Sequence, residues 1–418
     1  MQSQMDGDIK ERINVLWFPQ LRYLSLQPYA AIINEAKHKG QNILLDTSAY
    51  SGRFQAITET EKSTLLETYD NVYVLSPCKS KYHVQRNLDE YAKYKELKRK
   101  ILEIVHKENI GLAVFPTDFI YEFRVLRRCL PEVKLIVLQV SFRQSLPYRE
   151  YNFRHKIKAF CYDNFLGVPI FRANPNFGHQ HSTAWYFFWS EKWAKSIVNN
   201  MDSNLFFANA TLQNTNYQPP ISLPIQIAER KGNKPLVTIF LNKRLSIGLD
   251  AIINYTRIYQ YLIQKSENYF FVLKVHPQEE LKFFKSLYEG SKINNYLIVK
   301  DEYRPEELLL NSDLFITQWS TSIADCMKAR IPTLLLNPHK THDMESRMVA
   351  DFPFIAYDEE SIVSLMNSIL MQEESYWYTV EEFIKNSFGN SFNKGPQRFA
   401  EALRKVQAGE ITKGKLGK

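Results

Sequence analysis

The sequence predicts an α/β protein of two domains, each built around a parallel sheet whose strands alternate with helices. Short apolar runs alternate along most of the chain with longer amphipathic segments, and this pattern is typical of parallel sheets covered by helices on both faces. The 418 residues are enough for two domains of ordinary size. A proline-rich stretch near the middle divides the alternating pattern into two sets.

The first set occupies residues 1–213 and predicts the first domain. It opens with a βαβ unit whose helix spans 28–39, with Pro28 in the first turn and Gly40 just past the last. Proline and glycine at these positions are typical of helix ends. The predicted strands are 13–18, 42–46, 71–75, 110–115, 134–140 and 185–189, the last of the domain, and the further helices are 87–107, 122–130 and 191–199.

Residues 214–235 contain four prolines and few large apolar residues, which predicts a linker. Residues 236–372 repeat the alternation and predict the second domain, and residues 373–418 predict terminal helices that pack back toward the first domain, followed by a basic tail. The predicted strands are 236–241, 269–275, 296–299, 313–317 and 332–336, the helices are 250–265, 279–288, 305–311 and 322–330, and 359–407 is expected to be mostly helical.

Charge and cysteine content narrow the class of protein. Lys and Arg exceed Asp and Glu by 53 − 45 = 8, and no DNA- or RNA-binding motif accompanies them, so no nucleic-acid partner is predicted. A basic surface suits acidic substrates or an anionic membrane face. The four dispersed cysteines lack metal-ligand spacing and indicate a reducing compartment. Without a signal peptide or an apolar run of about 18 residues, we expect a cytoplasmic protein that touches at most the inner face of the membrane.

Polar residues follow the strand at 269–275, where parallel strands present ligand-binding loops. The residue before a proline is kept out of the helical region, so His276, before Pro277, should stay extended. Alternation then places Lys274 and His276 on one side. Lysine and imidazole at a strand end can bind phosphate oxygens or stabilise a leaving nucleotide. An ordinary turn with a solvated lysine and a structural histidine explains the pattern equally well.

The strand at 313–317 ends in a second polar cluster that leads into a helix. The free amides and the dipole of a helix amino terminus attract anions. Three hydroxyls exceed the one that N-capping needs, which favours phosphate binding over a simple cap. Asp325, in the first turn, is either a favourable first-turn acid or an acceptor for a ribose hydroxyl. The cluster consists of Gln318, Ser320, Thr321 and Ser322.

In the first domain, Asp118 follows the strand at 110–115 and is our candidate for a base that takes a proton from an acceptor hydroxyl. A cap for the next helix is an equal alternative. Weaker candidates for the acceptor side lie in loops near predicted strand ends: Arg22, Tyr23 and His83.

Two further stretches stay open or unassigned. Residues 146–178 are predicted to be irregular, and they fit either a surface excursion or part of an acceptor groove. His179 and His181 lie two positions apart without an evident third ligand, so no metal site is predicted.

The order of these features resembles the GT-B glycosyltransferases. The second half resembles more specifically the bacterial surface-polysaccharide transferases with an HP motif and a downstream serine motif: CDP-glycerol glycerophosphotransferases, capsular polysialyltransferases and Kdo transferases. Here the HP motif is His276-Pro277, the serine motif is 320–322, and 388–399 is similar to the closing segment. The resemblance covers about 236–404 and the first domain in outline. Thr321 departs from the pattern, in which a second serine is common.

The resemblance implies two Rossmann-like domains with parallel sheets facing across a cleft. It implies that His276 and the hydroxyls of 320–322 hold the donor phosphate, often of a cytidine nucleotide, and that neither a metal nor another cofactor is needed. In this hypothesis Lys274 helps His276 to stabilise the departing phosphate, Gln318 lines the donor site, and Asp118 activates the acceptor.

The predicted function is transfer of a sugar, or a polyol phosphate, from a nucleotide-activated donor to a hydroxyl of a bacterial surface glycan or lipid-linked glycan. One alternative is an enzyme similar to UDP-N-acetylglucosamine 2-epimerases. Two features speak against it: Val140 and Ser141 offer no carboxylate where that family has one, and the family's glycine-rich turn, which carries paired glutamates, is absent, with 319–325 in its place. The other is a non-catalytic GT-B-like scaffold that binds nucleotide without turnover.

Overall fold

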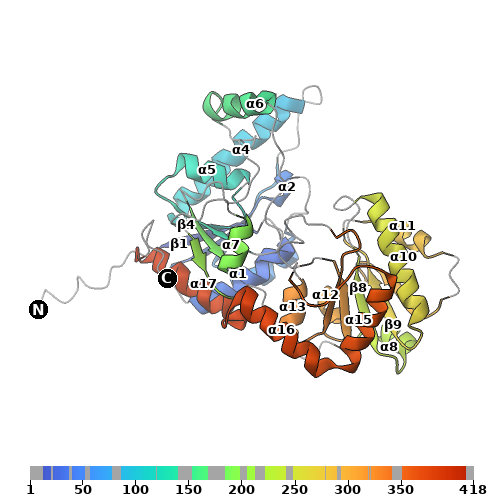
Figure 1. The fold of residues 1–418 in the computed structure, drawn as a ribbon. Coiled ribbons are helices and arrows are strands. Elements are labelled where there is room, and N and C mark those ends of the chain that lie inside the picture. Colours follow the sequence, from blue (N-terminus) through green and yellow to red (C-terminus); the bar gives the residue numbers. More distant parts are fainter. Residues whose placement is uncertain are drawn as a thin grey trace, which may run out of the picture. The chain divides into compact units, whose positions relative to one another are not determined.

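The computed structural model describes residues 13–19, 22–36, 40–51, 57–77, 86–118, 120–139, 153–167, 184–197, 205–211, 222–241, 248–277, 279–289, 293–318, 320, 322–340 and 351–410, to which all structural statements refer. The chain forms two compact units (Figure 1). The first combines Met1–Gln213 with Phe388–Lys418, and the second is Asn214–Ser387. The end of the chain therefore belongs to the same unit as its beginning.

The first unit is built on a seven-stranded sheet of order β3-β2-β1-β4-β5-β6-β7, in which all neighbouring strands run parallel. Nearly all residues of the inner strands are buried, as in sheets covered on both faces. The strands are β1 (Asn14–Trp17), β2 (Asn42–Asp46), β3 (Asn71–Val74), β4 (Ile110–Phe115), β5 (Lys134–Leu138), β6 (Trp185–Phe188) and β7 (Leu205–Phe207).

The final helix of the chain, α17 (Gly395–Gln407), packs beside α1 (Arg22–Ala36) in the first unit. Gln397 Nε2 donates to Glu35 Oε1 over 2.7 Å, and the ring of Phe399 contacts the ring of Phe187. The other helical elements are α2 (Ser48–Ser51), α3 (Glu59–Leu65), α4 (Arg86–Lys107), α5 (Tyr121–Cys129), α6 (Phe153–Asn164), α7 (Glu191–Ile197) and the 3₁₀ helix η1 (Phe392–Lys394).

The second unit is built on a six-stranded parallel sheet of order β10-β9-β8-β11-β12-β13. The strands are β8 (Leu236–Phe240), β9 (Phe270–Lys274), β10 (Tyr296–Val299), β11 (Leu314–Thr317), β12 (Thr333–Leu336) and β13 (Ile355–Ala356). The helices are α8 (Ile225–Lys231), α10 (Leu249–Lys265), α11 (Leu281–Leu287), α12 (Pro305–Leu309), α13 (Ser322–Ala329), α15 (Glu359–Met371) and α16 (Glu373–Phe388).

The predicted fold class is confirmed, because both units are α/β and both sheets are parallel. Counted within its own unit, the second sheet has the order 3-2-1-4-5-6, the doubly wound arrangement of nucleotide-binding folds, and the first sheet has the same order with a seventh strand added at its edge. The predicted strands all occur, within one or two residues at their ends.

The first helix differs from the prediction, since α1 begins at Arg22 and contains Pro28 in its interior. A proline there removes one backbone hydrogen bond. Packing outweighs that loss: Tyr29, the next residue, is fully buried, its ring lies 4.9 Å from the ring of Trp17, and its hydroxyl donates to Phe18 O.

Several further elements were not predicted, among them α2, α3 and β13. Strand β7 has only three residues and pairs with β6, so 185–189 is not the last strand of its unit. The predicted irregular stretch 146–178 contains α6. The stretch 214–235, expected to be a linker, contains α8, whose Ile227 is buried in the apolar core of the second unit with Leu236 and Phe270.

Tyr376 of α16 holds the start of β12, because its hydroxyl accepts from Thr333 N over 2.6 Å and donates to Thr333 O over 3.1 Å in a buried position. Tyr376→Phe should lower the free energy of unfolding by about 1–3 kcal/mol, the cost of leaving buried polar groups unpaired. Tyr378→Phe, on the same helix but 79% exposed, should change it by less than about 0.5 kcal/mol. Urea unfolding of both variants measures the difference, and equal effects would contradict this role of Tyr376.

Candidate functional site

The strand order of the second sheet marks a ligand-binding position. The chain moves from β8 to β9 on one side and returns to β11 on the other, and in such sheets ligands bind outside the carboxyl ends of the strands at this reversal. The donor-site candidates follow β9 and β11. These strands are the two neighbours of β8, so both sets of candidates lie at one edge, about 9–10 Å apart across β8.

The end of β11 presents buried polar groups. Thr317 and Gln318 are only 1% and 2% exposed, and within the described part of the chain Thr317 Oγ1 and Gln318 Oε1 have no hydrogen-bond partner. A buried polar atom without a partner costs about 1–3 kcal/mol. Such atoms in a native protein call for an explanation, and a polar ligand is one. Thr317 was not predicted as a site residue, although its place at the end of a strand and beside Gln318 was visible in the sequence.

The helix that follows, α13, begins at Ser322. Ser320 Oγ accepts from the Ser322 amide over 3.2 Å, so Ser320 caps the helix. Both serines are half-buried. Thr321, the third predicted hydroxyl, lies outside the described residues. This end of α13 therefore combines a helix amino terminus with two hydroxyls, directly after the unpartnered atoms of Thr317 and Gln318.

Lys274 ends β9 and is 7% exposed. Its ammonium donates to Lys300 O and, over 2.6 Å, to Tyr303 O, both in the loop between β10 and α12. Burial lowers the pKa of Lys274, and the negative charges of four carboxylates on this loop and on α12 raise it in part. The structure thus directs this lysine to the backbone of the loop. The four carboxylates belong to Asp301, Glu302, Glu306 and Glu307.

His276 follows β9 and is half-buried, with the exposed Pro277 after it. The extended backbone predicted for it is consistent with sheet pairing that continues past the strand, where Val275 N donates to Val299 O over 2.8 Å. The chain then turns, and His276 O accepts from Glu279 N over 2.9 Å. His276 is thus held by the strand on one side and by a tight turn on the other.

Asp325 lies one turn into α13 and is half-buried. Burial raises its pKa to about 7, the nearby Lys328 opposes this shift, and Glu306 of α12 adds to it. Burial also lowers the pKa of Lys328 to about 8, against the attraction of Asp325. The carboxyl group therefore changes charge near neutral pH, which suits a group that exchanges a proton or a hydrogen bond with a ligand.

The first unit has its own polar edge, at the ends of β2 and β4. Asp118 follows β4, is 1% exposed, and accepts a hydrogen bond from Tyr186 OH to its Oδ2 over 2.6 Å. It does not cap the helix after it, because the N-cap position of α5 is Ile120. The tyrosine that orients Asp118 was not predicted.

Glu122, in the first turn of α5, is a second carboxyl group at this edge that sequence analysis missed. Thr47, which follows β2, donates to Glu122 Oε1 over 2.5 Å, and Oε2 has no partner among the described residues. Burial raises the pKa of Glu122, the bond from Thr47 lowers it, and the charge of Asp46 adds to the rise. The one feature of the sequence that could have indicated Glu122 is its position four residues after Asp118.

Several predicted residues cannot be placed in a site. The side chains of Arg22 and Tyr23, at the start of α1, lie outside the described part, as do His83, His179 and His181. Across the described ranges, no group of three or more His, Cys, Asp or Glu side chains could hold a metal ion.

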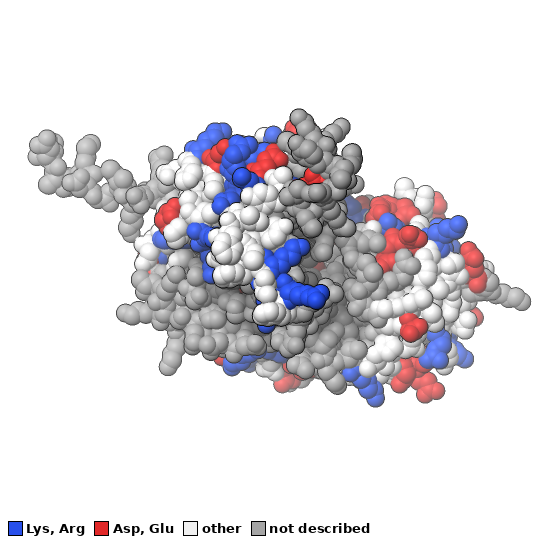
Figure 2. All heavy atoms as spheres, turned by 90° about the horizontal axis from the view of Figure 1, so that it is seen from above, with Lys and Arg blue, Asp and Glu red and all other residues white. Residues whose placement is uncertain are grey.

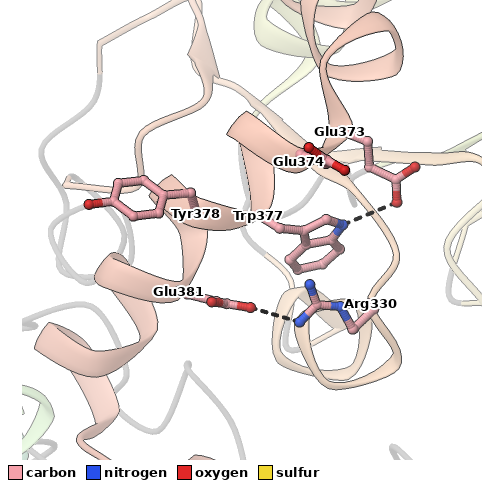
Figure 3. A pocket seen from close by; sticks show the side chains of 6 residues that line it. All are labelled: Arg330, Glu373, Glu374, Trp377, Tyr378 and Glu381. Carbon is pink, nitrogen blue, oxygen red and sulfur yellow. Dashed lines mark hydrogen bonds and ion pairs between the residues drawn. The ribbon is translucent and has the colours of Figure 1, made fainter.

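A separate pocket of about 390 Å³ lies in the second unit between Arg330 and the first half of α16 (Figure 3). Arg330 follows the far end of α13, so the pocket is not at the edge where His276 and Gln318 lie. Its polar groups bond to one another: Arg330 pairs with Glu381 over 2.8 Å and stacks on the Trp377 ring, and Trp377 Nε1 donates to Glu373.

No protein-family model matches the sequence, and a search of curated proteins finds no match. Solved structures do match over most of the chain. UDP-GlcNAc 2-epimerase from Neisseria meningitidis bound to UDP-GlcNAc has a TM-score of 0.57 at 12% identity, covering 94% of this chain and 99% of that one. A glycosyltransferase from Rickettsia africae has 0.58 at 11% identity, covering 95% and 99%. The glycosyltransferase SnogD from Streptomyces nogalater has 0.55 at 13% identity, covering 94% and 100%.

These matches show that the chain has the two-domain GT-B fold of glycosyltransferases and UDP-GlcNAc 2-epimerases. At such low identity they show the fold alone.

The raised pKa of Asp325 predicts a pH-dependent stability. Because its folded pKa of about 7 lies above the unfolded value of about 3.9, the folded chain holds a proton that the unfolded chain releases. The free energy of unfolding should therefore fall between pH 4 and pH 7 relative to Asp325→Asn. Asp325 is only partly buried, so we expect a relative change of about 1–3 kcal/mol. Urea titrations at several pH values, with the exposed Asp250→Asn as control, measure it; parallel curves for wild type and Asp325→Asn would contradict the shift.

Proposed function

We propose that the chain is an enzyme that binds a nucleotide-activated sugar, or polyol phosphate, at the carboxyl edge of the second sheet and transfers its activated group to a hydroxyl. The observation that carries this proposal is the end of β11, where Thr317 Oγ1 and Gln318 Oε1 are buried without partners in the described chain, next to the start of α13. A diphosphate or ribose supplies the hydrogen bonds that such groups need, and helix amides attract phosphate.

Each side chain at this edge then has a role set by its position. Ser322, Ser320 and the α13 amides bind phosphate oxygens, and His276, across β8, stabilises the charge that develops on the departing phosphate. Lys274 acts through the loop 300–303, whose carbonyls it holds. Asp325 accepts from a donor hydroxyl. We expect this transfer to need no metal.

The nucleotide base and the acceptor complete the proposal. The resemblance to HP-motif transferases suggests a cytidine nucleotide, whereas the N. meningitidis neighbour is bound to UDP-GlcNAc. We propose an acceptor hydroxyl on a bacterial surface glycan or lipid-linked glycan, activated by Asp118 of the first unit. Glu122, with its raised pKa and one oxygen that has no partner among the described residues, is a second candidate for the base.

Sugar 2-epimerisation is a second candidate for the function of this chain. It is favoured by the 2-epimerases among the similar structures and by the buried carboxyl groups at the edge of the first sheet. That reaction moves a proton at a sugar carbon and needs acid and base groups. Incubation of UDP-GlcNAc with the protein in D₂O distinguishes the two reactions. Deuterium at C2 of the sugar without an acceptor would identify the epimerase, and nucleotide release that depends on an acceptor would identify the transferase. A scaffold would bind nucleotide and give neither product.

Gln318→Leu should separate ligand binding from stability. Without ligand the variant should be as stable as the wild type or more so, because an apolar side chain replaces a buried unpartnered oxygen. The wild type should be stabilised by about 2.7 kcal/mol at 100 times the dissociation constant of the correct nucleotide, and the variant should lose most of this gain. A thermal-shift panel of CMP, CDP, UMP, UDP and GDP, with and without EDTA, measures both.

The control is Gln260→Leu, which removes a side-chain amide of α10 that donates to Leu287 O over 2.8 Å. It should lower stability without changing the nucleotide response. If Gln318→Leu leaves the nucleotide-induced rise in melting temperature unchanged, the proposed donor site is wrong. If no nucleotide raises the melting temperature of the wild type, the proposal that the chain binds one of these nucleotides is wrong.

His276 and Lys274 should fail in different ways. His276→Ala should lower turnover by about 10²-fold or more with the fold intact, the usual scale for losing an electrostatic stabiliser. Lys274→Met should lower the melting temperature, because two carbonyls lose a buried charged donor. Nucleotide release from the donor and thermal unfolding, measured on both variants, check this contrast. Unchanged turnover in His276→Ala would remove the histidine from the mechanism.

A further inference from the structure

Helix α6 exposes an unusual amount of apolar surface. It lies at the outer end of the first unit, beyond α4 (Figure 1), and Phe153 and Phe160 are 76% and 59% exposed. Phe165, directly after the helix, is 77% exposed and its ring contacts that of Phe160. Ile157 and Leu166 are also exposed. Single exposed apolar residues are common, but a contiguous group on one element usually marks an interaction site.

The exposed apolar residues form one stripe along the helix. At 100° per residue, positions 153, 157 and 160 lie within about 60° of one another. The opposite face holds α6 to the protein: Ala159 is buried, and the Tyr162 ring contacts Tyr91 of α4. The apolar stripe therefore points away from the unit, and its burial is not needed for the packing of the helix.

Basic residues border this stripe. Arg154 and Lys156, both exposed, lie at about +100° and −60° from Phe153, one on each side. Lys158 lies over the Tyr162 ring, and Lys95 of α4 lies over the ring of Tyr91, so two more cations flank the α4–α6 contact. Figure 2, which looks down on the side where α6 lies, shows lysine and arginine surface bordering uncharged surface there.

We propose that the α6 face, defined by Phe153, Ile157, Phe160, Phe165 and Leu166 with its flanking basic residues, docks onto an anionic lipid bilayer. An apolar stripe between rows of cations is the arrangement of helices that lie in the membrane interface, with aromatic side chains among the acyl chains and basic ones at the headgroups. Among the described helices none is long and apolar enough to cross a membrane. The inference stands on α6 alone and does not depend on the donor site.

The shape of the stripe and the cations beside it favour an anionic bilayer over a protein partner. The stripe is convex and only one helix wide, and a bilayer requires only such a protruding apolar edge. The sequence indicated only a basic surface as a means of membrane contact. The α6 face adds the apolar component, which charge alone does not supply.

The test is sedimentation of the full chain with vesicles of phosphatidylcholine, with and without phosphatidylglycerol. The variant Phe153→Ser/Phe160→Ser/Phe165→Ser should bind the anionic vesicles at least about tenfold more weakly. A matched control, Ile225→Ser/Leu249→Ser/Met371→Ser, removes three exposed apolar residues of the second unit and should bind as the wild type does. Arg154→Gln/Lys156→Gln, which removes the two cations beside the stripe, should weaken binding about fivefold for each charge, on anionic vesicles only.

Three results would overturn the proposal. The first is a wild type that does not bind anionic vesicles, or a stripe variant that binds them as tightly. The second is a change from dimer to monomer in the stripe variant, seen by light scattering, which would assign the stripe to a second copy of the chain. The third is a lower melting temperature with unchanged vesicle binding, which would show that the chain itself covers the stripe. Nucleotide thermal shifts, measured in parallel, report on the donor site independently.

Discussion

A parallel sheet ends all its strands at one edge, and this constraint determines where the chain can build a site. In the second unit, β9 and β11 both pair with β8, so residues about forty positions apart in the sequence lie at one edge of the sheet, on the two sides of β8. His276 and Gln318 share this edge for that reason alone. The same constraint in the first unit brings Thr47, after β2, and Glu122, after β4, into a hydrogen bond.

The polar groups at these edges divide into those that the fold uses and those that it leaves available. Lys274 is used, because its ammonium holds the backbone of the 300–303 loop. Asp118 accepts from Tyr186, and Ser320 caps α13. Among the described residues, Thr317 Oγ1, Gln318 Oε1 and Glu122 Oε2 are buried without a partner. A folded chain that carries such costs at the edge of each sheet is consistent with a site that a ligand completes.

Much of this could be predicted from the sequence. The alternation of apolar runs and amphipathic helices fixed the class of both units, because burial on both faces of a parallel sheet leaves a clear pattern. What escaped prediction depends on tertiary contacts. The sequence pattern predicts a helix that starts at Pro28, but α1 begins at Arg22 and continues past Pro28, because Tyr29 packs on Trp17. Helix α6 was missed because its apolar stripe faces outward, and the role of Lys274 was not visible because its partners are backbone carbonyls of a distant loop.

The proposed function requires above all that a nucleotide binds at the edge formed by β8, β9 and β11. A crystal structure of the chain with the nucleotide that stabilises it most would test this directly. We predict phosphate oxygens within hydrogen-bond distance of the Ser322 hydroxyl and of the Gln318 side chain, with His276 on the far side of β8 facing the same group. A nucleotide bound at the edge of the first sheet, or in the pocket beside Trp377, would contradict the account.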